Sequence, residues 1–196
     1  MSKTEIVCIL DRSGSMADMA DEAISGFNAF LKEQKEVKGK ANLTVCLFDN
    51  ELLYPYDNID IQEAVPMTKK TFVPRGTTAL YEAIGQTINK VSARVNTCCA
   101  CECQKDKVIV AILTDGLNNI DGEFSSKKIK EILEKKQKEE GWDVFYLAAN
   151  QDAFAVGGNM GVMASNIINY SSTEKGGTSK SYGSMSRNIR MSRVKK

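Results

Sequence analysis

The sequence contains no histidine among its 196 residues. A Ser-His-Asp triad, a Cys-His pair and a histidine-bound catalytic zinc are therefore excluded. No apolar run approaches the roughly 18 residues that a membrane-spanning helix needs. The first residues, which run into Asp11 and Arg12, also lack the cleavage pattern of a signal peptide. These absences predict a cytoplasmic protein without a membrane-spanning segment.

A strong charge of one sign is also missing. The formal net charge is +1, so bulk charge indicates neither a nucleic-acid nor a membrane partner. The distribution is uneven, because residues 173–196 carry a net charge of +6 and leave −5 for the rest. Residues 171–196 are rich in Ser, Gly and basic residues, and we expect a mobile tail or a helix that docks late. One domain is predicted over residues 1–170.

Apolar patterning predicts alternating strands and helices. Continuous apolar runs, and a hairpin turn at Asp49-Asn50-Glu51, predict strands at 5–10, 43–48, 52–56, 108–113 and 144–149, with a weaker one at 167–170. Helical spacing predicts helices at 17–37, 80–95, after a serine cap at 125 or 126, and over 153–163. Such alternation is typical of an α/β domain with a mainly parallel sheet. Ligands of these domains bind beyond the carboxyl ends of the strands.

Oxygen-bearing side chains follow two of the predicted buried strands. The first strand ends in Asp11-Arg12-Ser13-Gly14-Ser15, and the fourth apolar strand ends in Thr114-Asp115-Gly116. Between them, Arg75-Gly76-Thr77-Thr78 precedes a helix and offers another hydroxyl at the same edge. Carboxylate and hydroxyl oxygens suit magnesium, manganese or calcium better than zinc or copper. The sequence therefore predicts a divalent-metal site at this edge.

These three segments together resemble the metal-ion-dependent adhesion site of von Willebrand factor A domains. The resemblance covers roughly residues 4–170. Within the family, the chain is most similar to stand-alone bacterial or phage members, in which Asp-Arg-Ser-Gly-Ser-Met and Gly-x-Thr-Ala-Leu segments are typical. It implies a three-layer, doubly wound fold. In that fold the central sheet is mostly parallel with one antiparallel edge strand, and helices cover both faces.

The resemblance also implies roles for individual residues. Ser13 and Ser15 would bind the metal directly, and Asp11 and Asp115 would bind it directly or through water. Counting back from the following helix favours Thr78 as the fifth ligand, with Thr77 as the second choice.

The predicted function follows from the charge of this site. Two carboxylates and three neutral hydroxyls leave one of the six positions around magnesium open to solvent, and carboxylates that act only through water leave the charge of the cation incompletely neutralised; manganese or calcium could take its place. A carboxylate of another protein would complete the shell, so we expect a non-enzymatic protein-binding module.

Two alternatives remain. The first is a scaffold component in which the metal only stabilises the fold. The second is a magnesium-dependent phosphotransferase of the haloacid dehalogenase type, which also begins with an aspartate after the first strand. That family needs a second aspartate where this chain has Ser13, and an acidic pair where Asp115 is followed by glycine.

The six cysteines divide into two groups. Cys8 and Cys46 lie in strand-like runs and are expected to be small buried hydrophobes. The other four lie in Cys98-Cys99-Ala100-Cys101-Glu102-Cys103, for which an exposed reduced loop, a metal site and a disulfide or redox element all remain open.

Overall fold

The computed structural model describes residues 3–97, 106–120, 122–149, 152–171, 174 and 176–194. The strands in this part of the chain are β1 (Thr4–Asp11), β2 (Ala41–Phe48), β3 (Leu52–Asp60), β4 (Lys107–Thr114), β5 (Asp143–Ala149) and β6 (Ile167–Tyr170). The helices are α1 (Ala20–Glu36), α2 (Leu80–Thr97), α3 (Ser126–Lys138), α4 (Ala153–Asn159) and α5 (Gly177–Val194). Short 3-10 helices are η1 (Gly14–Met19), η2 (Ile61–Glu63) and η4 (Ala164–Asn166).

The strands form one sheet in the order β3-β2-β1-β4-β5-β6. Every neighbouring pair is parallel except β2 and β3, which are antiparallel at one edge. The predicted mostly parallel sheet with an antiparallel edge strand is therefore confirmed. The chain passes from β1 to β2 on one side and returns to β4 on the other. The topological switch point thus lies between β1 and β4, where an α/β sheet places its ligands.

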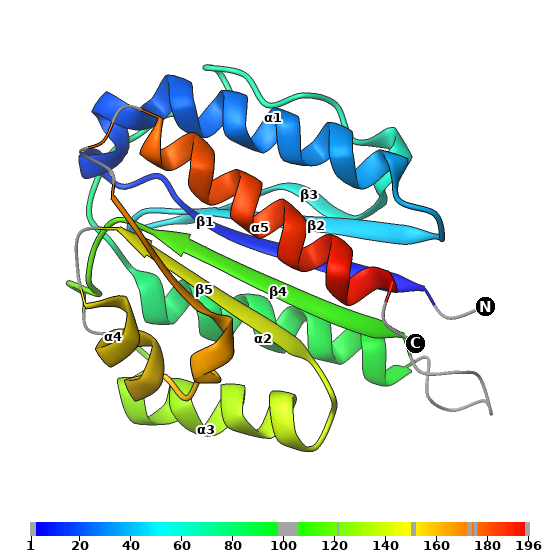
Figure 1. The fold of residues 1–196 in the computed structure, drawn as a ribbon. Coiled ribbons are helices and arrows are strands. Elements are labelled where there is room, and N and C mark those ends of the chain that lie inside the picture. The colour runs from blue at the N-terminus through cyan, green and yellow to red at the C-terminus, as the bar shows by residue number, and fades with distance from the viewer. Residues whose placement is uncertain are drawn as a thin grey trace.

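Helices cover both faces of the sheet, with α1 and α5 on one face and α2, α3 and α4 on the other (Figure 1). Alternate residues of β1 divide the core between these layers. Ile6, Cys8 and Leu10 pack on the α1 and α5 side. Val7 and Ile9 pack on the α2 and α3 side. A strand buried on both faces needs no polar alternation, which is why β1 reads as a continuous apolar run.

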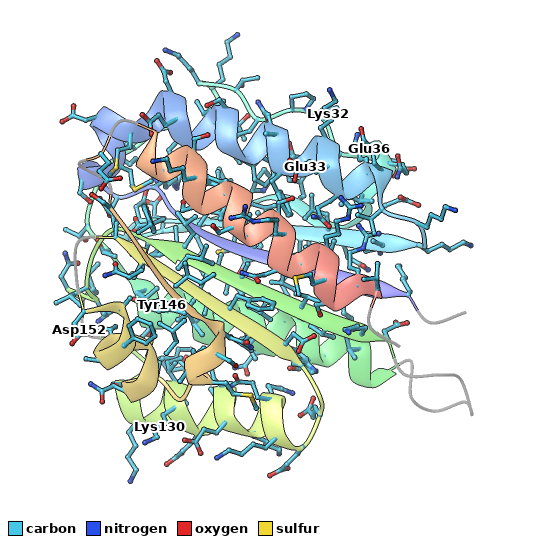
Figure 2. All side chains as sticks on the ribbon, viewed as in Figure 1. Lys32, Glu33, Glu36, Lys130, Tyr146 and Asp152 are labelled. Atoms are coloured by element: carbon cyan, nitrogen blue, oxygen red, sulfur yellow. The ribbon has the colours of Figure 1, made fainter. Side chains whose placement is uncertain are left out.

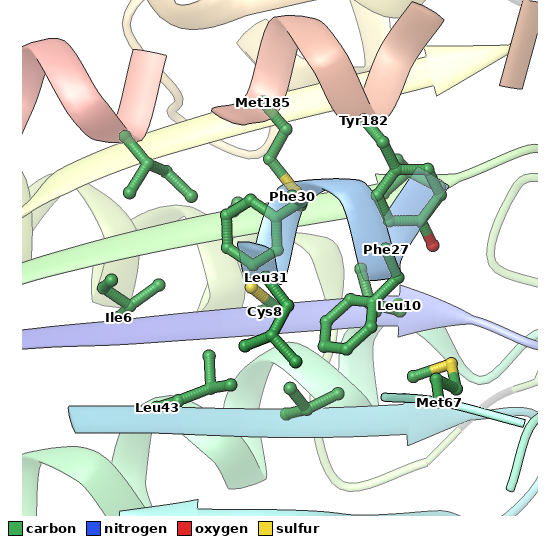
Figure 3. Packing of buried hydrophobic residues seen from close by; sticks show 14 of the residues in the cluster. Ile6, Cys8, Leu10, Phe27, Phe30, Leu31, Leu43, Met67, Tyr182 and Met185 are labelled. Atoms are coloured by element: carbon green, nitrogen blue, oxygen red, sulfur yellow. The ribbon is translucent and has the colours of Figure 1, made fainter. Parts of the chain in front are cut away.

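Helix α5 belongs to the domain rather than to a separate tail. Tyr182 and Met185 of α5 pack above Cys8, together with Phe27 and Phe30 of α1 (Figure 3). The fit is close, because a Cβ added to Gly26 of α1 would lie 2.7 Å from the Tyr182 ring. The expected boundary at residue 170 therefore moves to include α5.

Of the two alternatives for residues 171–196, the docked helix is confirmed, and the sequence could not choose between them because the buried face of α5 is largely small and polar. Ser181, Ser186 and Ser192 are buried alongside the few apolar residues of the helix. The Oγ atom of Ser186 accepts a hydrogen bond from Nε2 of the buried Gln34 of α1, at 3.1 Å. Polar contacts replace part of the apolar stripe by which amphipathic helices are recognised.

The remaining differences concern element ends. Helix α4 ends at Asn159, short of the expected residue 163, and β3 continues to Asp60. The serine cap predicted at residue 125 or 126 is Ser125, whose side chain accepts a hydrogen bond from the amide of Lys128 at 3.3 Å. Within the described residues, no helix has the length and apolar character needed to cross a bilayer.

Candidate metal centre

Asp11 is the last residue of β1, and its carboxylate is fully buried. Oδ1 accepts a hydrogen bond from the amide of Ser13 at 2.7 Å. Oδ2 accepts one from Oγ1 of Thr114, the last residue of β4, at 2.6 Å. Because its own loop and the neighbouring strand both hold it, the carboxylate has a fixed orientation at the switch point.

A row of oxygens continues from the β1 loop to the β4 loop. Oγ of Ser13 and Oγ of Ser15 are 3.1 Å apart. Oγ of Ser15 then donates to Oδ1 of Asp115 at 2.9 Å. The structure therefore brings together the Asp11, Ser13, Ser15 and Asp115 side chains that the sequence selected.

These separations also fit one small cation. Ligands at neighbouring corners of an octahedron with metal–oxygen distances of about 2.0–2.1 Å lie about 2.9 Å apart. Calcium, with distances of about 2.3–2.6 Å, would need neighbouring ligands about 3.3–3.7 Å apart. The row from Ser13 to Asp115 is held by hydrogen bonds at 3.1 and 2.9 Å, so its oxygens are already close enough together to become ligands of one cation.

Thr78, rather than Thr77, is the buried threonine beside the loop that carries Asp115. Thr78 is buried, whereas Thr77 is exposed. A Cβ added to Gly116 would lie 3.4 Å from Oγ1 of Thr78, so this hydroxyl lies beside the loop of Asp115. This position agrees with the choice of Thr78 made by counting back from the following helix.

Electrostatics favour a cation here. Burial raises the pKa of Asp11 above its ordinary value, and the nearby negative charge of Asp115 raises it further. Burial also raises the pKa of Asp115. Two carboxylates that ionise with difficulty are stabilised by an adjacent positive charge. Among the described residues, no group of three or more Cys, Asp or Glu side chains could hold a metal, so ligation at this edge depends on the hydroxyls.

Asp49 holds together the loops that carry these donors, although its sequence position indicates only a hairpin turn. It follows β2 and its carboxylate is fully buried. Oδ2 lies 2.9 Å from Nε of Arg75 and 3.2 Å from Nε of Arg12. The Arg12 contact is an ion pair that is not aligned as a hydrogen bond. We call Asp49, Arg12 and Arg75 the Asp49 clamp.

Main-chain hydrogen bonds strengthen the clamp. The amide of Arg75 donates to the carbonyl of Arg12 at 2.9 Å, and that of Gly14 donates to the carbonyl of Gly76 at 3.2 Å. Gly76 has a φ of +64°, and a Cβ there would lie 2.0 Å from Oδ1 of Asn50. A glycine is thus required where the loop before α2 passes the turn after β2.

Two asparagines that the sequence analysis missed position the start of α2. Oδ1 of Asn119 accepts from the amide of Thr78 at 2.8 Å. Oδ1 of Asn118 accepts from the amide of Tyr81 at 3.1 Å. Both belong to the loop after β4, so this loop fixes Thr78 as well as supplying Asp115. Their only sequence signal is position, shortly after Thr-Asp-Gly.

Asp152, Cys8 and Cys46 are not part of the row of oxygens. Asp152, which is labelled in Figure 2, caps α4 by accepting from the amide of Ala155 at 3.0 Å. Cys8 and Cys46 are buried free thiols, as expected. The cysteine loop at 98–103 lies outside the described residues.

No family model and no curated protein matches the sequence. Solved structures do match the fold. The proximal thread matrix protein 1 of mussel byssus, solved with a zinc-occupied MIDAS motif, matches with a TM-score of 0.65 and 15% identity, over 98% of this chain and 48% of that one. The vWF domain of the type V pili tip protein Mfa5 from Porphyromonas gingivalis matches with a TM-score of 0.65 and 10% identity, over 100% and 97%.

A third match is the manganese-loaded TRAP protein of Plasmodium vivax, with a TM-score of 0.57 and 22% identity, over 75% of this chain and 57% of that one. This chain spans about half the length of the mussel protein. At these identities the matches establish a shared fold. Two of the three proteins were solved with a divalent metal, in the mussel protein at its MIDAS motif.

Proposed function

We propose that this chain, which has the von Willebrand factor A fold, is a non-enzymatic module that binds a partner protein through a divalent metal ion. The observation that carries the proposal is the row of oxygens from Ser13 through Ser15 to Asp115, with separations of 3.1 and 2.9 Å. Together with Asp11 and Thr78, these side chains would hold the metal. Magnesium is the expected ion because all the donors are hard oxygens, with manganese or calcium as the alternatives.

The donor set favours recognition of a carboxylate. Two carboxylates and three neutral hydroxyls do not saturate a divalent cation, which takes six oxygen ligands. Ser15 is exposed, whereas Asp11 is buried, so the open side of the site faces solvent at Ser15. An Asp or Glu side chain of the partner would reach the cation from this side. Asp11 would orient the hydroxyl ligands, and the metal would supply the positive charge that attracts the partner.

Metal binding gives the first test. A cation bound only by the folded chain should stabilise it by about 2.7 kcal/mol at a hundredfold excess over Kd. We expect magnesium to raise the melting temperature of the wild type but not that of Asp11→Ala or Ser13→Ala. Ser25→Ala is the matched control, because Ser25 is an exposed serine on α1. Equal magnesium-induced shifts in wild type and Asp11→Ala would reject the site.

Partner binding gives the second test, once a partner is isolated from the native host. We expect EDTA and Asp11→Ala each to weaken the complex by about 2–5 kcal/mol, because either change leaves a charge unmatched in a partly desolvated contact. Affinity that is unchanged in EDTA, despite magnesium-dependent melting, would support the scaffold alternative. Metal-dependent hydrolysis of an aryl phosphate would support the phosphotransferase.

A further inference from the structure

An open surface cavity of about 280 Å³ begins at Ala17 of η1, two residues along the chain from Ser15. One wall is formed by η1 and the first turns of α1, from Ala17 to Ile24, and the other by residues 69–74. We call this cavity the side pocket. No part of the metal site lines it, so it requires an explanation of its own.

The side pocket is tied to the metal site through both of its walls. The first wall begins two residues after Ser15, and the second ends four residues before Thr78. The hydrogen bond from Gly14 to Gly76 joins the two segments between the pocket and the site. An extended peptide covers about 3.3–3.6 Å per residue. A segment that placed a carboxylate on the metal would therefore reach the pocket within a few residues.

The lining combines an apolar interior with negative charge. Ile24, Phe72 and Val73 supply apolar surface. Asp18 and Asp21 supply two carboxylates, and Lys69 supplies one cation. Lys69 pairs with Asp21 at 2.7 Å, and both side chains are largely exposed. Asp18 is exposed and forms no ion pair within the described part of the chain, so the pocket retains one uncompensated negative charge.

A long basic side chain suits this lining. Lysine and arginine place an aliphatic stem along apolar surface while the charged end remains in a polar setting. The stem would contact Ile24 and Val73, and the cation would reach Asp18. A purely apolar side chain would leave the Asp18 charge unmatched, and an acidic one would be repelled by it.

We propose that the side pocket binds a lysine or arginine of the partner, two to four residues from the Asp or Glu that completes the metal shell. This inference rests on the proposed function, since the metal fixes the register of the bound segment. It adds a sequence preference to that function: the partner presents an acidic residue closely followed or preceded by a basic one.

Short peptides test the pairing. Ac-Glu-Gly-Gly-Lys-NH2 and its Leu and Ala analogues would be titrated into the labelled protein in magnesium, with dissociation constants taken from NMR shifts. We expect the Lys peptide to bind about 2- to 5-fold more tightly than the Ala peptide, the gain typical of one exposed ion pair. Asp18→Asn should remove this difference and leave magnesium-dependent binding of the Ala peptide intact. Asp60→Asn, remote from the pocket on β3, should change neither.

The outcomes separate the two proposals. Equal binding of all three peptides in EDTA and in magnesium would reject the metal-dependent function. Magnesium-dependent binding with equal affinities for Lys and Ala would overturn the side-pocket inference alone. Tighter binding of the Leu peptide would also overturn it, in favour of an apolar occupant. A Lys preference that persists in Asp18→Asn would show that the cation binds elsewhere.

Discussion

Asp49→Ala is expected to lower the free energy of unfolding by about 3–5 kcal/mol, the cost of leaving a buried charge without its partner. The Arg12 side chain is 7% exposed and would lose the carboxylate that it faces at 3.2 Å. The amide of Glu51 would also lose its acceptor, Oδ1 of Asp49 at 2.6 Å. Urea unfolding at neutral pH, with and without magnesium, measures the loss.

Glu51→Gln is the matched control for this substitution. Glu51 pairs with the same Arg75, but its side chain is 64% exposed. Exposed pairs contribute little because water screens them, so this variant should unfold much like the wild type.

We also expect Asp49→Ala to weaken magnesium binding, because the clamp joins the loops of Ser13 and Thr78. If Asp49→Ala lowered the free energy of unfolding by less than about 1 kcal/mol, the expectation would be wrong, because water would then replace the carboxylate.

Tyr182→Ala is expected to cost about 3–5 kcal/mol, as for other large aromatic side chains removed from a core. Tyr182 is 1% exposed and lies between α5 and α1, so its removal leaves a cavity above Gly26. Tyr182→Phe should behave differently. The buried hydroxyl has no hydrogen-bond partner among the described residues, and removing an unsatisfied polar group is neutral or stabilising.

Thermal and urea unfolding of the two variants would separate packing from hydroxyl effects. Tyr182→Phe should match or exceed the stability of the wild type, and Tyr182→Ala should melt well below both. A loss of about 2 kcal/mol in Tyr182→Phe would contradict this expectation, because it is the cost of a lost buried hydrogen bond. In that case the Tyr182 hydroxyl is hydrogen-bonded to a buried water molecule.

The sequence predicted the parts of this structure that depend on local pattern. Strand β1 is recognisable because burial on both faces demands an uninterrupted apolar run. Asp11, Ser13 and Ser15 are recognisable because three oxygen donors at alternate positions leave that strand. The carboxyl ends of parallel strands share one edge, so the same reasoning brought Asp115 to the site.

The parts that the sequence did not predict depend on contacts between distant segments. Asp49 is an ordinary turn residue until Arg12 and Arg75 are placed around it. Asn118 and Asn119 acquire a role only when the β4 loop meets the start of α2. For residues 171–196 the sequence left a mobile tail and a docked helix open, because small polar side chains such as Ser181 take the place of a clear apolar stripe on the buried face of α5.

The central place of β1 has a mechanical consequence. β1 is hydrogen-bonded along its length to β2 on one side and to β4 on the other, in parallel register. The start of β1 and the end of α5 both lie at the edge opposite the metal site (Figure 1). A pull between a partner bound at the loop after β1 and the start of β1 runs along the strand axis. It loads both hydrogen-bond ladders in shear, so their bonds must yield together, whereas a strand peeled from an edge gives way one bond at a time.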